Sequence, residues 1–265
     1  MVARQGEEVP SPLVPAAHPE SPALPEKTDN LAKPRRFYKV VDTAPADVGF
    51  AVRLDGRTPR SPGGRLLEVP TETLAEMIAL EWRAQGEFID MGSMRLTRLA
   101  YTALDGVAQT REATAQLLAD YAGTDLVCYF AEGPMSLVAR QEEAWGPLLD
   151  WADFELGIPL ARAHGILHRP QPPQSLAQVK ALALEGDHFG LAGLAFGAAL
   201  FGSAVLALAL AQGRLTGAEA FELSRLDEAF QEELWGVDED AAARTAALAG
   251  DAGMLEQWFR ALARG

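Results

Sequence analysis

The sequence has little that would support a secreted or nucleic-acid-binding protein. Only one of its 265 residues is a cysteine, Cys128, which excludes an intramolecular disulfide framework and fits a reducing compartment. Lys and Arg number 23 against 37 Asp and Glu, so the net charge is −14. Because binding to phosphates requires clustered basic side chains, this balance argues against a nucleic-acid partner. It favours a protein partner with a basic surface.

The signatures of nucleotide, metal and nucleophile chemistry are also missing. Neither GxxxxGK[ST] nor GxGxxG occurs, so we predict that nucleotide is neither bound nor hydrolysed. His164 and His168 have the spacing of one helical turn, but Arg169-Pro170 follows them and no Cys or carboxylate completes a metal set. Ser203 lacks the GxSxG pattern of a nucleophile elbow. The sequence therefore predicts no catalytic residue, no cofactor and no metal.

The first 34 residues are rich in proline, alanine, serine and glutamate, and they have few large apolar side chains to bury. This composition predicts a mostly extended or disordered arm. The arm lacks the apolar stretch of a secretory signal, and its four glutamates are unlike a mitochondrial presequence. We therefore expect the protein to stay in the compartment where it is made.

After the arm the pattern predicts an α+β domain over 35–130 and an all-helical domain over 131–265. Residues 37–41 and 49–54 carry aromatic and β-branched side chains, and Asp55-Gly56 is a hairpin turn signal, which together favour a small antiparallel sheet. Thr71 can cap a helix that follows it. Further helices are predicted over 94–107, 110–121 and 135–156, with a last strand over 126–130.

Residues 189–213 contain no charged side chain, and this segment is long enough for a membrane span. Gly193-x3-Gly197 within it is a helix-packing motif of membrane proteins. The flanks, however, lack a cluster of Lys and Arg, and much of the segment is Ala and Gly. We therefore predict a buried helix of a soluble bundle, whose small residues let neighbouring helices approach closely.

Residues 223–238 hold the most informative stretch of the chain. On one helix, Leu223, Leu226, Phe230 and Leu234 would share an apolar face, while Ser224, Glu228, Gln231, Glu232 and Trp235 would lie on the opposite side. A surface helix whose Trp folds back onto a neighbour would explain this pattern. A contact surface for a protein partner would explain it as well, because Trp is enriched at the energetic centres of interfaces.

Six short motifs occur in the order known from one protein family. They are Phe37-Tyr38-Lys39, Leu54-Asp55-Gly56-Arg57-Thr58-Pro59, Glu81-Trp82-x2-Gln85, Thr124-Asp125-Leu126, Gln141-x3-Trp145-x-Pro147-x3-Trp151 and Leu226-Asp227-Glu228-x2-Gln231-x3-Trp235-Gly236-x-Asp238. Over about residues 36–260 the chain resembles the assembly chaperone that binds the α subunit of the ATP synthase catalytic head (the Atp-twelve type). Each motif is weak alone, but the ordered set is specific.

The resemblance implies a chaperone with no cofactor and no enzymatic turnover, whose partner is the ATP synthase α subunit. By position in the family motif, Glu228 is the main partner-binding residue, Asp227 and Gln231 support it, and Trp235 is an anchor. Trp82 is expected to have a structural role in holding the two domains together. Such proteins occur in mitochondria and in some bacteria, and the missing presequence favours a bacterial cytoplasm. We also expect the protein to be a monomer.

Two other functions stay open at this level. A membrane-associated assembly protein would use the apolar segment 189–213. A hydrolase would gather carboxylates or histidines from distant segments into one cleft, which a sequence does not exclude.

Overall fold

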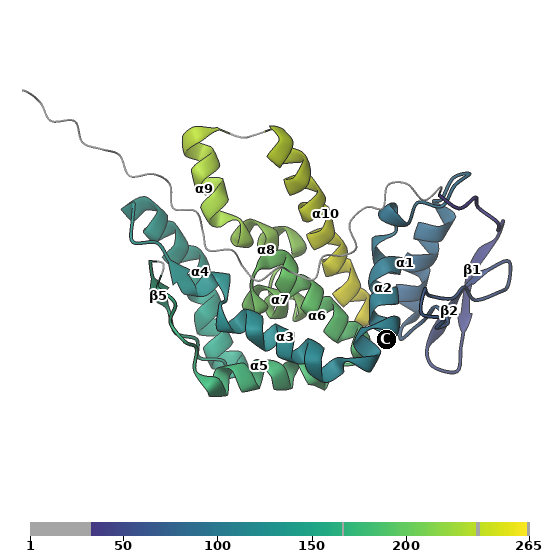
Figure 1. The fold of residues 1–265 in the computed structure, drawn as a ribbon, viewed down its shortest axis with the longest axis horizontal. Coiled ribbons are helices and arrows are strands. Elements are labelled where there is room, and N and C mark those ends of the chain that lie inside the picture. The colour runs from purple at the N-terminus through teal and green to yellow at the C-terminus, as the bar shows by residue number, and fades with distance from the viewer. Residues whose placement is uncertain (1–32, 166, 237–238, 264–265) are drawn as a thin grey trace, which may run out of the picture. The chain divides into compact units, whose positions relative to one another are not determined.

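A computed structural model describes residues 33–165, 167–236 and 239–263, of which residues 239–241 are described by their backbone only (Figure 1). The predicted arm over 1–34 lies outside these residues except for its last two. The predicted α+β class is confirmed, because a small antiparallel sheet near the start of the described chain is followed mainly by helices.

The sheet has three antiparallel strands in the order β1-β2-β3, with β1 at Val41–Pro45, β2 at Phe50–Leu54 and β3 at Glu68–Val69. The first strand begins later than predicted from residues 37–41. The backbone N–H groups of Lys39 and Val40 donate to the Asp55 carboxylate, at 3.1 and 2.8 Å, so this segment does not pair as a strand. The Asp55-Gly56 turn forms, but it folds Leu54 back onto Arg57 and does not join β1 to β2.

Helix α1 (Glu72–Arg83) packs against the sheet, and α2 (Arg95–Asp105) packs against α1 (Figure 1). Thr71 caps α1 as predicted, since its side chain accepts from the N–H of Leu74 at 3.2 Å. The N-terminus of α2 is capped from outside the helix, because the Glu81 carboxylate accepts the N–H groups of Leu96 and Thr97 at 2.7 and 2.8 Å. These contacts satisfy amides that a helix leaves unpaired at its start.

Helices dominate the rest of the chain. They are α3 (Arg111–Gly123), α4 (Met135–Leu156), α5 (Pro173–Glu185), α6 (His188–Phe201), α7 (Ala204–Ala211), α8 (Gly217–Ser224), α9 (Leu226–Trp235) and α10 (Glu239–Leu262), together with the 3₁₀ turns η1 (Met91–Ser93), η2 (Val107–Gln109) and η3 (Leu126–Cys128). The predicted strand over 126–130 is mostly η3, with β4 limited to Tyr129–Phe130. It pairs in parallel with β5 (Ala163–His164), a short strand within the otherwise helical part.

The apolar segment 189–213 forms two helices, α6 and α7, which lie among α3, α4, α8 and α10 (Figure 1). All but one residue of α7 are buried, so the prediction of burial is confirmed. A Cβ at Gly193 or Gly197 would come within 2.9 Å of side chains of α10, which explains why small residues are needed there. No helix among the described residues has the length and apolarity that crossing a bilayer requires.

Several contacts cross residue 130, the predicted end of the first domain. Helix α3 packs against α5 and α6, and α10 packs against α1 and α2. The Thr71 hydroxyl donates to the carbonyl of Ala261 at 2.9 Å, and Arg95 forms an ion pair with Asp251 at 2.7 Å. The described residues thus belong to one compact unit, and the boundary at 130/131 stays a prediction.

Candidate partner-binding site

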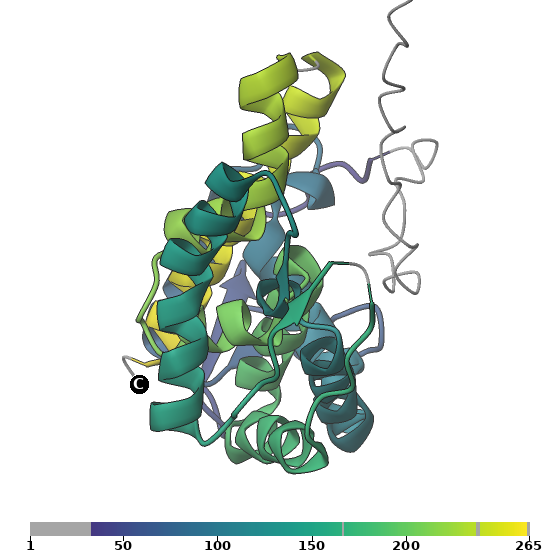
Figure 2. The ribbon, with the colours of Figure 1, turned by 90° about the vertical axis from the view of Figure 1, so that its left-hand side faces the viewer.

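The segment that carries the predicted partner-binding residues is α9, and it is held in place by α4. The buried side chains of Leu226 and Phe230 attach α9 to the core. The Arg140 guanidinium of α4 binds both carboxylate oxygens of Glu233, at 2.7 and 2.9 Å, and lies over the Phe230 ring. Figure 1 and Figure 2 both show α9 beside the first part of α4. The exposed side of α9 is therefore presented by a supported helix.

The four predicted residues have different environments on α9. Glu228 is 54% exposed at its side chain and lies 3.8 Å from Arg225, which is a loose ion pair. Gln231 is half-buried, and Trp235 is 76% exposed at the end of the helix. Asp227 turns inward, because its carboxylate accepts from the side-chain amide of Gln141 at 2.7 Å. Glu228, Gln231 and Trp235 are thus accessible to a partner, whereas Asp227 also attaches α9 to α4.

The charge state of Asp227 reflects this position. Burial raises the pKa of its carboxyl group, the hydrogen bond from Gln141 opposes that effect, and the neighbouring Glu228 adds to it. The Glu233 carboxyl group behaves in the opposite way, since its hydrogen bond to Arg140 lowers its pKa. Contacts with α4 therefore shift the pKa of one carboxyl group of α9 against the effect of burial and lower the pKa of another.

Two residues do not follow the single helical face predicted over 223–235. Ser224 was placed on the solvent side, but it is buried and its hydroxyl donates to the carbonyl of Phe221 at 2.7 Å. Leu234 was placed on the core side, but it is 58% exposed. The helix is interrupted at Arg225, between α8 and α9, so the rotation of 100° per residue does not continue from Ser224 into α9. Leu234 shares the face of Leu226 and Phe230, but it lies in the last turn of α9, beyond the two residues that this helix buries.

Leu234 therefore lies beside the exposed Trp235, and the helical pattern of the sequence did not reveal the exposure of Leu234. A cavity of about 470 Å³ adjoins α9 and is lined by residues of α8, α9 and α4, among them Glu219, Glu222 and Leu226. The sequence does not predict this cavity, because the cavity depends on how α8 and α9 pack together. The exposed surface around α9 thus combines carboxylates, an amide and two large apolar side chains.

Comparisons with known proteins give the chain its family. The family described as ATP12 chaperone protein matches residues 35–153. The crystal structure of Atp12 from Paracoccus denitrificans superposes with a TM-score of 0.81 at 43% identity, over 86% of this chain and 97% of that one. A mutant of the P. denitrificans Atp12p superposes with a TM-score of 0.82 at 42% identity, over 86% of this chain and 99% of that one.

The chain belongs to the ATP12 chaperone family. A curated relative, the mitochondrial protein atp12 of Schizosaccharomyces pombe, is 27% identical over 78% of this chain and 75% of its own length. The family predicted from the six ordered motifs is therefore confirmed. This is a family of chaperones, and the absence of enzymatic turnover stays a prediction.

The ATP12 motifs from distant parts of the chain meet in the fold. Gln141 is fully buried, and its side-chain oxygen accepts from the N–H of Ala131 at 2.7 Å while its amide reaches Asp227. The indole N–H of Trp145 donates to the carbonyl of Leu223 at 3.0 Å. The motif residues of α4 thus hold α8 and α9 against α4. Asp238, the last residue of the ATP12 motif, lies outside the described residues.

The other ATP12 motifs stabilise the fold at separate places. Trp82 packs against Tyr38, with ring centroids 5.7 Å apart, and its carbonyl accepts from the Tyr38 hydroxyl. These contacts join α1 to the segment that precedes β1, while Thr71 and Arg95 provide the links to α10 described above. Among the described residues no group of three or more His, Cys, Asp or Glu is arranged to hold a metal ion.

Proposed function

We propose that this protein is an assembly chaperone that binds the free α subunit of the ATP synthase catalytic head and shields its subunit interface until β subunits replace it. Membership in the ATP12 family supports the chaperone role. The single observation that carries the choice of surface is the exposed side of α9, where Glu228, Gln231 and Trp235 are accessible on a helix that α4 supports.

The chemistry of this surface suits a chaperone that must release its client without ATP. A free subunit exposes apolar surface that it later buries, and such surface is prone to aggregation. A contact that mixes polar groups with a few apolar anchors can cover it with moderate affinity, since interface area alone does not set affinity. Trp235 and Leu234 supply the apolar anchors, and Glu228 supplies a charge that can steer a basic partner group.

We further propose that the protein acts as a monomer in a bacterial cytoplasm. The relatives from P. denitrificans support a bacterial setting. The net charge of −14 fits a partner with a basic contact surface.

The substitution Glu228→Lys tests the proposed surface. We expect it to leave the melting temperature unchanged, because Glu228 is exposed and its ion pair with Arg225 is long, at 3.8 Å. Capture of purified α subunit should fall strongly, since reversing the charge replaces attraction by repulsion against a basic partner group. Pull-down of α and thermal unfolding are measured in parallel.

Glu155→Lys is the matched control, because Glu155 is an exposed glutamate near the C-terminal end of α4, away from α9. This variant should bind α normally. A Glu228→Lys protein that captures α as well as the wild type would refute the proposed surface. A variant that melts several degrees lower before binding is lost would assign Glu228 to the stability of α9.

A further inference from the structure

Three of the ATP12 motifs meet at a cavity that the proposed function does not use. This cavity, which we call the Trp82 cavity, has a volume of about 620 Å³, within the usual size of ligand pockets. Its wall is rich in aromatic side chains, which are Phe37, Tyr38, Trp82 and Tyr101. Tyr38 and Trp82 are buried and stabilise the fold, but Phe37 is 71% exposed. Stability therefore does not explain the aromatic side chain at the rim.

The indole N–H of Trp82 is a buried donor without an acceptor. Trp82 is 5% exposed, and no atom of the described residues accepts a hydrogen bond from this N–H. The buried indoles of Trp145 and Trp258, by contrast, donate to the carbonyls of Leu223 and Phe189, at 3.0 and 3.1 Å. A buried donor that stays unpaired costs free energy, so native proteins rarely keep one. Because Trp82 lines the cavity, a molecule bound there can supply the acceptor.

Other free polar groups of the wall are also donors. The side chain of Arg57 is exposed and forms no hydrogen bond or ion pair within the described part of the chain. The hydroxyl of Tyr101 forms no hydrogen bond there either. Burial raises the pKa of Tyr101 to about 12, and the charge of Asp105 adds to this effect, so the hydroxyl keeps its proton.

Two acceptors of the wall, by contrast, are already engaged. The Asp55 carboxylate accepts from the N–H groups of Lys39 and Val40, at 3.1 and 2.8 Å. The carbonyl of Trp82 accepts from the Tyr38 hydroxyl at 2.7 Å. The free hydrogen-bonding capacity of the wall is thus mainly that of a donor. A complementary ligand has acceptors and apolar surface but few donors of its own.

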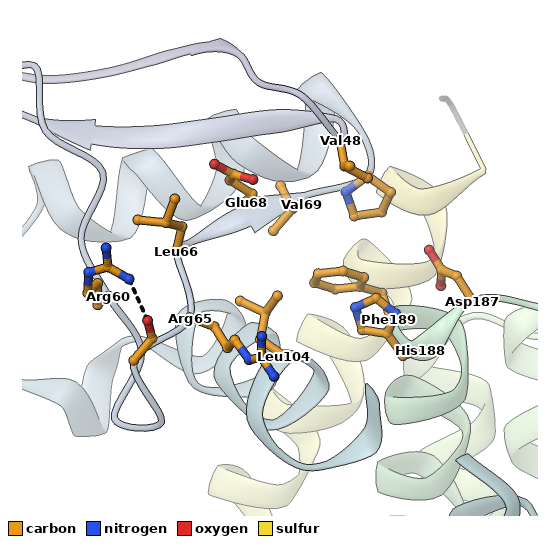
Figure 3. Close-up of a pocket in the computed structure, with 12 residues that line it drawn as sticks. Val48, Arg60, Arg65, Leu66, Glu68, Val69, Leu104, Asp187, His188 and Phe189 are labelled. Atoms are coloured by element: carbon orange, nitrogen blue, oxygen red, sulfur yellow. Dashed lines mark hydrogen bonds between the residues drawn. The ribbon is translucent and has the colours of Figure 1, made fainter. Parts of the chain in front are cut away.

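A cavity of about 520 Å³ beside β3, which shares Arg60 with the Trp82 cavity, does not select a ligand in this way (Figure 3). In its lining, Arg60 and Arg65 are balanced by Glu68 and Asp187, and Arg60 donates to the carbonyl of Gly64 at 2.7 Å. Among the described residues, the unpaired buried donor belongs to the Trp82 cavity alone.

A proline-rich segment has the chemistry that the Trp82 cavity requires. Proline has an acceptor carbonyl but no N–H, and its ring is apolar. Proline-rich segments form an extended polyproline helix, which docks in grooves lined by aromatic side chains. Such a segment loses little conformational freedom on binding, because the helix is formed beforehand.

We propose that the Trp82 cavity binds a proline-rich segment of another protein. A carbonyl of this segment accepts from the indole N–H of Trp82, and its proline rings pack against Phe37 and Tyr101. The exposed position of Phe37 lets the segment enter from solvent. The inference goes beyond the proposed function and does not depend on it.

Fluorescence anisotropy with the full chain and a labelled decamer of L-proline tests the site. We expect saturable binding, whereas a decamer of D-proline, whose helix has the opposite hand, should bind at least about tenfold more weakly. Trp82→Phe should weaken binding of the L-proline decamer about tenfold, because it removes the N–H and keeps an aromatic ring. The melting temperature of this variant is measured in parallel.

Phe37→Ala tests the same cavity at its exposed rim, where the core is not altered. It should weaken binding at least about fivefold, since aromatic side chains contribute strongly at interfaces. Phe154→Ala is the matched control, because Phe154 is 83% exposed on α4 and does not line the cavity. The control should bind the decamer as the wild type does, and both variants should keep its melting temperature.

The proposal is overturned if the L-proline decamer does not bind saturably, if the D-proline decamer binds equally well, or if Phe37→Ala weakens binding no more than Phe154→Ala. A Trp82→Phe protein that melts like the wild type and binds normally would overturn it as well. A tenfold gain in affinity on removal of the proline-rich residues 1–32 would identify the arm of this chain as the occupant, against a partner protein. None of these outcomes depends on capture of the α subunit.

Discussion

Among single residues, buried carboxylates of this chain accept hydrogen bonds from backbone N–H groups. Asp125 is fully buried and accepts from Val127 at 3.3 Å and from Val205 at 3.1 Å, which ties η3 to the first turn of α7. Burial raises the pKa of the Asp125 carboxyl group to about 6, although its hydrogen bonds oppose this shift. Asp125 belongs to a family motif but is too buried to contact a partner protein, so its role is structural.

This pKa predicts how Asp125→Asn changes the pH dependence of stability. Because the folded value exceeds the ordinary value of the carboxyl group, the folded state holds the proton more tightly than the unfolded state. The resulting stability is fully present below the ordinary value and is lost as pH rises through about 6. The free energy of unfolding of the wild type should thus gain about 1 kcal/mol relative to Asp125→Asn between about pH 8 and about pH 5.

Denaturant unfolding of both proteins at several pH values measures this gain. A difference between wild type and Asp125→Asn that stays constant over this range would show that Asp125 does not titrate there. Asp120→Asn is the matched control, because it makes the same chemical change at an exposed aspartate of α3.

At the scale of elements, close packing of helices depends on where small residues lie. On α6, a Cβ at Gly193 would come within 2.9 Å of ring atoms of Phe259 and Trp258, and Trp258 is fully buried. On α10, a Cβ at Gly253 would meet no atom within 4 Å. Two glycines in helices thus differ in what surrounds them, and only the one on α6 is required by the approach of another helix.

The same substitution at these two positions should therefore have opposite effects. Gly253→Ala should raise the free energy of unfolding by up to about 1 kcal/mol, because alanine favours the helix. Gly193→Ala should lower it by about 1 to 2 kcal/mol, since the added methyl group overpacks the core by more than the helix preference returns. Thermal or denaturant unfolding of both variants decides the matter. Equal effects of the two substitutions would contradict the close packing of α6 on α10.

At the scale of the whole molecule, the last helix returns to the first elements of the fold. Helix α10 contacts α1 and α2, and it also contacts α6, α7 and α8. The α+β part is therefore completed by residues from the far end of the sequence. The ion pair Arg95–Asp251 and the hydrogen bond from Thr71 to Ala261 are specific links between the two parts.

From this arrangement we predict that a fragment of residues 35–130 does not fold by itself. It would lack α10, and it would expose the side of α3 that packs against α5 and α6. The full chain should unfold in a single transition by circular dichroism, whereas the fragment should show no cooperative transition. A fragment that melts cooperatively would instead support an independent domain that ends at the predicted boundary.

Nucleotide is not expected to regulate the whole protein. The chain lacks a phosphate-binding loop, and its net charge of −14 disfavours a polyphosphate. Calorimetric titration with ATP and magnesium at millimolar concentration should show no saturable heat. A micromolar isotherm would contradict the prediction, and it would call for a release mechanism driven by nucleotide.

The family, the class of the fold and most of the helices follow from the order and type of the residues alone. The order of six motifs was enough for the family, and α4 has the bounds that its pattern predicts, residues 135–156. Thr71 caps α1 as expected. These features depend on residue types within one local segment or on their order, and both can be read without a fold.

The points at which the local patterns end depend on contacts between distant parts of the folded chain. The start of β1 moved because Asp55 takes the N–H groups of residues 39 and 40, and the apolar segment divides at Gly202 and Ser203, where Ser203 caps α7. Asp227 turned inward because Gln141, which is 86 positions away, donates to it. A hydrogen bond between distant residues has no local pattern, so its partners and the surfaces that they leave exposed emerge only when the chain has folded.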